Sequence, residues 1–371
     1  MFGALTNALR RPARAGAVTI PPPKEPSARW GTPSSAVPRR QVRVAAIRRE
    51  TADAVTLLLE PVDGRPLPFS AGQYLTHCFE VGGRAVKRAY SISSMHSPDS
   101  NSVACTIKAV EGGVASGFVQ TGIEVGYQYT VIGPSGDFLL PADYDGPLAF
   151  LAAGSGITPV MAMIDTVLHQ DPGRPVSLVY ASRRQSDIIF ADRLAELDDT
   201  CPGLTVTYVL SRPDADWAGR RGRLDGEQAA KLLQVEPGAQ IYLCGPADLM
   251  ADTTGALLAD GVPADRIHRE RFYAAAQHTT PLPTLPQPIE FRRSNLTIVA
   301  QPGETILEAG LRGGVNLDFS CTVGGCGACK VRMVSGAVSI DEPNCLTDTE
   351  KADGYTLGCS AYALESAVVD A

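Results

Sequence analysis

Three different patterns of apolar and polar residues, which follow one another along the sequence, divide this chain of 371 residues. Between residues 41 and 134, short runs rich in β-branched and aromatic residues are separated by turn-forming Gly, Pro, Asp and Asn. Such spacing is typical of an antiparallel barrel built from short strands. We expect six strands, over residues 42–47, 55–59, 74–81, 89–92, 103–110 and 127–132.

The second pattern begins at about residue 146, where apolar runs alternate with helical stretches. Strands are predicted over 148–152, 176–180, 204–210 and 240–243, and helices from Thr158 and over 188–197 and 247–258. Near-continuous apolar strands that alternate with amphipathic helices indicate a parallel sheet covered on both faces. The sequence therefore predicts an α/β domain.

The third pattern follows a proline-rich stretch over 274–288, which we interpret as a stiff linker. Beyond it the pattern predicts a hairpin over 289–291 and 296–299, a helix over 305–311, and a loop rich in Gly and Cys. This order is typical of a small β-grasp domain. The predicted fold is multidomain, with a barrel over 39–143, an α/β domain over 144–273 and a β-grasp domain over 289–371.

Composition and charge narrow the classes of protein to which this chain can belong. Residues 1–38, rich in Pro, Arg, Ser and Ala, are predicted to be disordered, with an organelle transit peptide as the alternative. A content of 44% hydrophobic and 20% charged residues is typical of a globular protein. No apolar run in the sequence approaches the roughly 20 residues of a membrane span, so we expect a cytoplasmic protein. A net charge of −7 gives no reason to expect nucleic-acid binding.

The strongest chemical signal is the spacing of Cys321, Cys326, Cys329 and Cys359. Four thiols spaced Cys-x4-Cys-x2-Cys and then Cys resemble the ligands of a plant-type [2Fe-2S] ferredoxin. The alternatives are a zinc site or ordinary buried thiols, although structural zinc sites usually pair two short Cys-x2-Cys knuckles. Cys345 is the rival fourth ligand, but the residues before Cys359 resemble those before the family's fourth cysteine. The five other cysteines have no recognisable spacing, which favours a reducing compartment.

A second motif lies on a predicted barrel strand, Arg88-Ala89-Tyr90-Ser91. It resembles the Arg-x-Tyr-Ser flavin motif of the ferredoxin-NADP reductase superfamily. The resemblance implies that Arg88 pairs with a flavin phosphate, that Tyr90 packs against the flavin and that Ser91 hydrogen-bonds near its N5. Residues 112–116 resemble the second flavin segment, in which Gly113 and Ser116 open a helix that receives a pyrophosphate. Residues 88–94 look more like FAD-using than FMN-using members.

A third motif, over residues 154–159, follows an apolar strand. Gly154 and Gly156 let the backbone approach a pyrophosphate, while Thr158 is expected to cap the next helix. With Cys244-Gly245-Pro246 at the end of a later strand, this segment resembles the superfamily's nicotinamide-nucleotide site. The resemblance places Cys244 beside the nicotinamide; a buried structural thiol is the alternative.

Nucleotide choice depends on the groups that face the ribose 2′ position. Arg183, Arg184 and Arg212 follow two strands and suit a 2′-phosphate, but the sequence leaves NADPH and NADH both open. In reductases with an appended ferredoxin, an aromatic residue after the last strand lies against the flavin. Phe272 is the candidate for that gate, with a plain core phenylalanine as the alternative.

The order of these motifs resembles electron-transfer components of oxygenase systems, namely ferredoxin-NADP reductase-type modules with a C-terminal ferredoxin. The resemblance implies that electrons pass from NAD(P)H through FAD and the [2Fe-2S] cluster to a separate terminal oxygenase, demethylase or desaturase. Residues 289–371 hold six basic and eleven acidic side chains. This acidic surface either steers a basic partner protein or is an ordinary solvated face. The alternative is a ferredoxin-like carrier or redox sensor with a non-functional flavin site.

Overall fold

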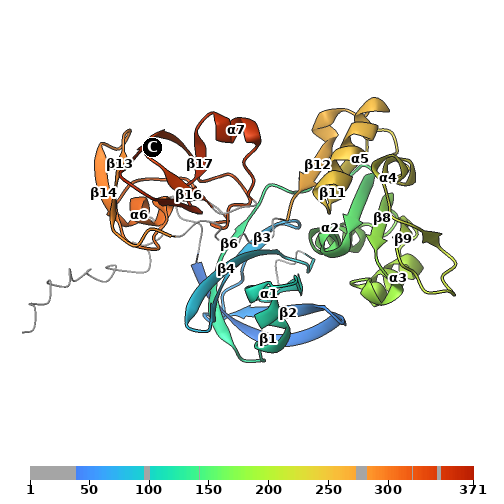
Figure 1. Ribbon diagram of the computed structural model, residues 1–371. Coiled ribbons are helices and arrows are strands. Elements are labelled where there is room, and N and C mark those ends of the chain that lie inside the picture. Colours follow the sequence, from blue (N-terminus) through green and yellow to red (C-terminus); the bar gives the residue numbers. More distant parts are fainter. Residues whose placement is uncertain (1–38, 96–100, 142, 273–281, 320, 341–343) are drawn as a thin grey trace, which may run out of the picture.

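The computed structural model describes residues 39–95, 101–141, 143–272, 282–319, 321–340 and 344–371. Three sheets form the centres of three bodies (Figure 1). The predicted disordered tail and most of the predicted linker lie outside the described residues. Among the described helices, none has the length and apolar character needed to cross a bilayer.

The first body is a barrel of six antiparallel strands in the order β4-β3-β6-β1-β2-β5. A bridge between Ile92 and Cys105 joins its two edges, so the sheet closes on itself. Helix α1 (Val114–Thr121) packs against this barrel. The predicted antiparallel barrel is confirmed, with strands β1 (Arg39–Thr51), β2 (Ala54–Pro61), β3 (Tyr74–Val81), β4 (Arg84–Ser91), β5 (Val103–Lys108) and β6 (Gln128–Ser135).

The second body is a parallel sheet in the order β10-β9-β8-β7-β11-β12, which confirms the predicted α/β domain. Alternate residues of β7 face opposite layers: Phe150 lies in a core with helix α2, and Leu151 in one with α4 and α5. The elements are β7 (Leu148–Ala153), α2 (Ile157–Gln170), β8 (Val176–Ser182), α3 (Ala191–Thr200), β9 (Leu204–Leu210), β10 (Arg220–Arg221), α4 (Gly226–Leu232), β11 (Gln240–Cys244), α5 (Ala247–Ala259) and β12 (Ile267–Glu270). The short 3-10 turns are η2 (Gly154–Gly156), η3 (Gln185–Asp187) and η4 (Ala264–Arg266).

One predicted helix boundary in this body is wrong. The helix expected over 188–197 begins only at Ala191, because Ile188 is extended and Phe190 has a left-handed backbone with φ of 63°. The apolar run 188–190 is buried in the core as a turn, so its hydrophobicity reports burial and not helical periodicity.

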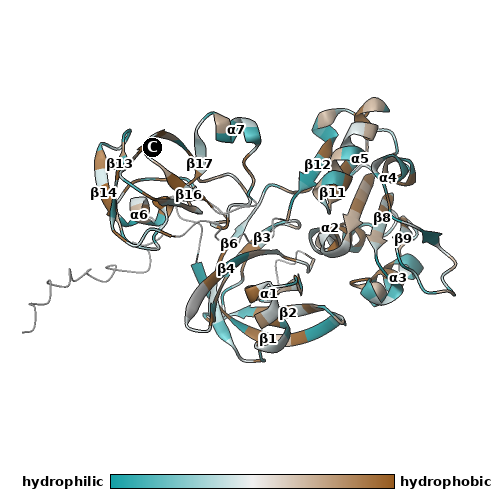
Figure 2. Cartoon of the chain, in the orientation of Figure 1, coloured by the Kyte–Doolittle hydropathy of each residue, from teal (hydrophilic) through white to brown (hydrophobic). Residues whose placement is uncertain are grey.

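The third body is a mixed sheet in the order β14-β13-β19-β15-β17 with a separate pair, β16 and β18. Helix α6 begins with a capping box between Thr305 and Glu308, as its Thr-x-x-Glu sequence favours. Figure 2 shows hydrophilic residues on the outward surface of α7. The elements are β13 (Gln287–Phe291), β14 (Leu296–Ala300), α6 (Ile306–Arg312), β15 (Lys330–Ser335), β16 (Val338–Ile340), α7 (Asp348–Ala352), β17 (Tyr355–Leu357), β18 (Ala361–Ala363) and β19 (Ala367–Asp370). Strand β13 therefore starts two residues inside the stretch interpreted as linker.

Candidate functional site

Strand β4 carries the Arg-x-Tyr-Ser motif next to β3. Ser91 lies opposite Tyr74 and is 3% exposed, and within the described residues its Oγ has no hydrogen-bond partner. A buried hydroxyl without a partner is rare in native proteins, because its desolvation is not compensated. Arg88 and Tyr90 are half-buried on the same strand. The unpaired Ser91 hydroxyl fits a ligand with a hydrogen-bonding ring atom, such as a flavin.

Behind Tyr90 lies a residue that sequence reasoning missed. His77 of β3 is fully buried, and its ring meets the Tyr90 ring edge to face at 5.3 Å. Its Nδ1 lies 2.8 Å from the Tyr129 hydroxyl, and burial lowers the pKa of His77 to about 3. A neutral imidazole thus supports the Tyr90 ring from inside the barrel. A lone histidine in a strand gives no sequence signal for this role.

The turn before α1 also offers a place for an anion. Gly113 is the N-cap and has no side-chain cap, so backbone N–H groups of the first helical turn point outward from it. The Ser116 hydroxyl accepts a bond from the Val110 amide at 3.1 Å and lies 3.4 Å from the Gly113 carbonyl. Ser116 therefore braces the turn, and the backbone amides remain the groups suited to a pyrophosphate.

The glycine loop of the α/β domain lies directly on the end of β11. A Cβ added to Gly156 would stand 2.1 Å from the Cys244 carbonyl oxygen, so only glycine fits there. Gly154 has φ of 55°, which also favours glycine. The two glycines therefore join the carboxyl ends of β7 and β11, the edge at which α/β sheets bind ligands.

The prediction that Thr158 caps helix α2 is wrong. The N-cap of α2 is Gly156, and Thr158 is the second helical residue, 2% exposed. Its hydroxyl donates to the Ser155 carbonyl at 3.0 Å. The cause is the 3-10 turn Gly154–Gly156, which starts the helical backbone before Thr158 is reached. The helix entrance is thus left without a side-chain cap.

Cys244 ends β11 and is 1% exposed, and Gly245 and Pro246 lead from it into helix α5. Burial, and then the nearby Glu270 carboxyl, raise the pKa of its thiol well above the ordinary value. Glu270 lies opposite Cys244 on β12, and burial raises the pKa of this carboxyl to about 8. Its Oε2 is buried and has no partner within the described residues.

Sequence reasoning missed Glu270, although an acidic residue at the end of a strand beside the Cys-Gly-Pro strand is a usable signal. Two residues later, Phe272 is 46% exposed. The alternative that Phe272 is a core residue is therefore wrong, whereas its role as a gate stays a prediction.

Arginines gather where β8, β9 and β10 end. The side chains of Arg183, Arg184 and Arg212 are exposed, and the Arg212 amide donates to the Arg183 carbonyl at 2.8 Å. Strand β10 adds Arg220 and Arg221 beside β9. These residues lie at the carboxyl edge that also holds Gly156.

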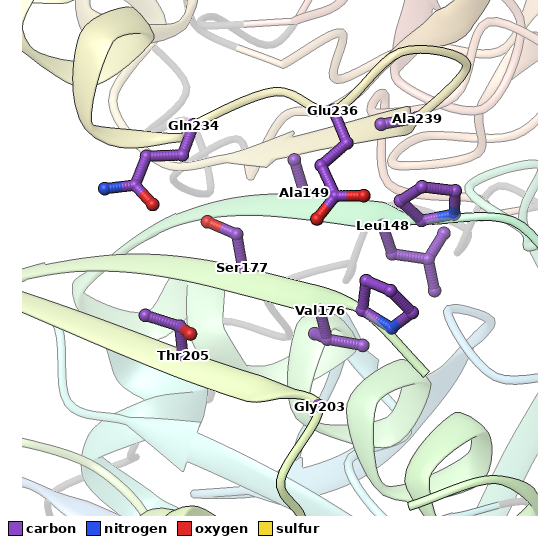
Figure 3. A pocket seen from close by; sticks show the side chains of 11 residues that line it. Leu148, Ala149, Val176, Ser177, Gly203, Thr205, Gln234, Glu236 and Ala239 are labelled. Carbon is purple, nitrogen blue, oxygen red and sulfur yellow. The ribbon is translucent and has the colours of Figure 1, made fainter. Parts of the chain in front are cut away.

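A cavity of about 80 Å³ lies at the opposite edge of the sheet, where the strands begin (Figure 3). Ser177, Thr205 and Glu236 are among the residues that line it. Because ligands of parallel sheets bind at the carboxyl ends of the strands, this cavity is not part of the nucleotide site.

The four cysteines of the third body come together. The Cys321 and Cys326 thiols lie within hydrogen-bonding reach of each other, as do those of Cys329 and Cys359, and Cys321 also reaches Cys359. Cys345 lies beside the loop, with its amide donating to the Gly324 carbonyl at 3.0 Å. Four neighbouring thiols suit the four ligand positions of a [2Fe-2S] cluster. No three His, Cys, Asp or Glu side chains of the described residues converge on the position of a single metal ion.

The backbone around the thiols suits a cluster as well. The amides of Val323 and Gly325 donate to Cys321 Sγ at 3.4 and 3.3 Å, and that of Gly324 donates to Cys359 Sγ at 3.3 Å. The neighbouring Cys321 thiol and burial raise the pKa of Cys326. Four cysteines that meet at this spacing, with backbone amides that donate to two of their sulfurs, fit the donor set of an iron-sulfur cluster.

The cysteine loop rests on the barrel. The Thr76 hydroxyl of β3 donates to the Cys321 carbonyl at 2.8 Å, and Lys87 of β4 forms an ion pair with Glu308 of α6 at 3.1 Å. Ile132 of β6 is buried in the hydrophobic core of the third body. The face of β3, β4 and β6 that carries Thr76, Lys87 and Ile132, which we call the docking face, thus joins the cysteine loop to the strand pair of the Arg-x-Tyr-Ser motif.

Three protein families match successive parts of the chain. The oxidoreductase FAD-binding domain matches residues 44–139, the oxidoreductase NAD-binding domain 150–255, and the 2Fe-2S iron-sulfur cluster binding domain 289–364. The matches coincide with the three bodies and with the order of motifs. The cofactors are therefore FAD, NAD(P)H and a [2Fe-2S] cluster.

Relatives match this chain over nearly their whole length. The chain is 34% identical over 342 residues to a component of the 1,2-phenylacetyl-CoA epoxidase of Escherichia coli (strain K12), covering 88% of this chain and 95% of the relative. It is 30% identical to the stachydrine N-demethylase reductase subunit Stc4 of Rhizobium meliloti (strain 1021), covering 87% and 94%. The solved structure of phthalate dioxygenase reductase has the same fold, with a TM-score of 0.68, 24% identity and coverage of 90% and 98%.

Proposed function

The chain belongs to the family of flavin and iron-sulfur reductases that includes these oxygenase and demethylase components, and from this premise we propose that it uses NADPH and serves an iron-containing oxygenase or demethylase. It is an NAD(P)H-dependent oxidoreductase and passes electrons to a separate protein. When bound, FAD accepts a hydride from NAD(P)H and the cluster accepts and releases electrons one at a time.

Different residues of this chain bind the nucleotide, the flavin and the cluster. Gly154 and Gly156 bring the nucleotide pyrophosphate to the entrance of α2, and Gly245 and Pro246 shape the turn beside the nicotinamide. Ser91 offers its unpaired hydroxyl to the flavin, and Arg88 its charge to the flavin phosphate. Cys321, Cys326, Cys329 and Cys359 hold the cluster.

Hydride transfer needs a site from which water is excluded, and Cys244 and Phe272 exclude it. Cys244 contributes a small, buried side chain that excludes water, and burial keeps its thiol protonated. Phe272, exposed at the end of β12, covers the flavin until nicotinamide displaces it. Glu270 is neutral at pH 7, since its pKa is raised to about 8.

The preference for NADPH rests on the exposed arginines at the carboxyl ends of β8 and β9. Arg183, Arg184 and Arg212 present guanidinium groups at the edge where the adenosine ribose would lie. Guanidinium groups bind a phosphate in a bidentate manner, which suits the 2′-phosphate that distinguishes NADPH from NADH.

One observation supports this function above the others: the cysteine loop lies on the strand pair that carries the flavin motif. The test is an anaerobic titration of the purified protein with NADPH and NADH in parallel, followed by its visible spectrum. We expect flavin and cluster absorbance to bleach with both, and faster with NADPH.

An Arg183→Ala/Arg212→Ala variant should lose the preference, whereas Arg43→Ala, at an exposed barrel position paired with Glu60, should keep it. A cluster spectrum without flavin or nucleotide response would instead favour the ferredoxin-like carrier. Equal rates with both nucleotides would contradict the NADPH assignment alone.

A further inference from the structure

The docking face combines three different contacts with the third body. Ile132 contributes apolar burial, Lys87 contributes a charge to Glu308, and Thr76 contributes a hydroxyl to the cysteine loop. The first two contacts hold the body as a whole. The third is a hydrogen bond to a proposed cluster ligand, since its acceptor is the carbonyl of Cys321.

Thr76 lies where its hydrogen bond to Cys321 is shielded from water. The residue is 0% exposed and Cys321 is 2% exposed, so water does not compete for either partner. The Cys321 thiol accepts the amides of Val323 and Gly325, so a displacement of the Cys321 backbone would also move these donors. One hydroxyl therefore fixes the position of the loop and of its sulfur.

The other side of Thr76 leads to the flavin motif. In the β3–β4 pair, Thr76 lies opposite Ala89, between the rungs that hold Arg88 and Tyr90. Directly opposed residues of an antiparallel pair share one face, so Thr76, Ala89 and Ser91 all lie on the docking side of the sheet. The path from Ser91 to Cys321 thus runs two residues along β4 to Ala89, across to Thr76 and through one hydrogen bond.

We propose that Thr76 is the positioning residue for electron transfer within this chain: its hydroxyl holds the Cys321 backbone at a fixed place against the flavin strand. This inference rests on the proposed function, because it assigns Thr76 to the step between the flavin and the cluster. The residue binds neither cofactor and acts through Cys321. Electron transfer depends steeply on distance, so loosening this one contact slows that step and leaves hydride transfer to the flavin unchanged.

The test compares Thr76→Val, which keeps the shape and removes the hydroxyl, with Thr76→Ser, which keeps the hydroxyl. Thr253→Val is the matched control, because Thr253 is equally buried and donates to the Leu249 carbonyl at 2.7 Å in helix α5 of the α/β domain. Each full-length holoprotein is mixed anaerobically with NADPH, and flavin and cluster absorbance are followed separately. Hydrogen exchange of residues 321–329 is measured on the same samples.

We expect Thr76→Val to slow cluster reduction by about 3- to 10-fold, the factor that corresponds to one lost hydrogen bond. Exchange in residues 321–329 should rise, while flavin reduction stays at the wild-type rate. Thr76→Ser should restore both values, and Thr253→Val should match wild type.

Wild-type cluster reduction and exchange in Thr76→Val would overturn the inference, as would flavin reduction slowed to the same extent. A wild-type protein whose flavin responds to neither nucleotide would instead refute the proposed function. In that case the exchange measurement still decides whether Thr76 holds the loop.

Discussion

The ion pair between Lys87 and Glu308 should control how firmly the third body stays on the docking face. Lys87 Nζ lies 3.1 Å from Glu308 Oε1, and the two side chains are 22% and 13% exposed. Glu308 has a second role, because its Oε2 accepts the Thr305 amide in the capping box of α6. The informative change is therefore Glu308→Gln, which removes the charge but retains a residue that completes a capping box.

The size of the effect follows from the geometry. Two unit charges 3.1 Å apart attract by about 5 kcal/mol at an effective dielectric constant of 20. Desolvation of two largely buried charges and the ordering of two long side chains offset most of this, which leaves about 1–2 kcal/mol. We thus expect the ratio of docked to undocked protein to fall about 5- to 30-fold in Glu308→Gln.

The assay is a double-mutant cycle with Lys87→Gln, Glu308→Gln and both together. Cluster reduction by NADPH and small-angle scattering of the holoprotein are recorded at low and high ionic strength. Each single variant should be at least as slow as the double, because either change removes the same pair and leaves the partner without its counterpart. Wild type should approach the variants as salt rises, since salt screens the pair.

A matched control is Glu304→Gln. Glu304 pairs with Arg312 at 2.7 Å, and the hydrogen bonds of its side chain within the described part of the chain stay inside the third body. It should leave cluster reduction and its salt dependence at wild-type values. Additive effects of Lys87→Gln and Glu308→Gln, or a wild-type rate independent of salt, would refute the reasoning.

Three further changes have defined outcomes. Cys359→Ser should lose most of the about two irons per chain that a [2Fe-2S] cluster holds, whereas Cys345→Ser should retain them; equal iron loss in an analysis of both would contradict this ligand set. Gly156→Ala, whose Cβ would lie 2.1 Å from the Cys244 carbonyl oxygen, should lower kcat/KM for NADPH about 10- to 100-fold at an unchanged flavin content, and a wild-type kcat/KM would contradict the close packing. The pKa of His77 is about 3 in the folded chain and about 6.5 in the unfolded chain, so between these values only the unfolded chain binds the proton. Its contribution to the free energy of unfolding is therefore present above pH 6.5 and falls by about 2 kcal/mol from pH 7 to pH 5. Urea unfolding of His77→Phe should lack this part of the acid loss, and an unchanged pH dependence would count against a buried neutral histidine.

Local sequence patterns predicted the helices and strands correctly where residues close in sequence decide the structure. The alternation of the barrel strands predicted β3 at its observed bounds, and the Thr-x-x-Glu sequence marks the capped start of α6. The boundaries failed where tertiary packing overrides local preference. Phe190 takes a left-handed turn because residues 188–190 fill a core, and Thr158 loses its capping role to the preceding 3-10 turn.

The candidate site divides in the same way. Glycine loops, the Arg-x-Tyr-Ser segment and the spacing of the four cysteines are short-range patterns. Through their resemblance to a known family, the sequence by itself determined that a flavin, a nicotinamide nucleotide and a [2Fe-2S] cluster are expected, and in which order. The roles of the individual residues in these motifs stay predictions. The FAD-binding, NAD-binding and 2Fe-2S families match in the expected order.

Only the tertiary structure decided which residues support those motifs from outside them. His77 meets Tyr90 through the register of β3 and β4, and Glu270 meets Cys244 through that of β11 and β12. Thr76 meets Cys321 across 245 residues because one body packs on another. These contacts depend on sheet register and domain packing, which arise from the sum of many weak long-range interactions and leave no periodicity in the sequence.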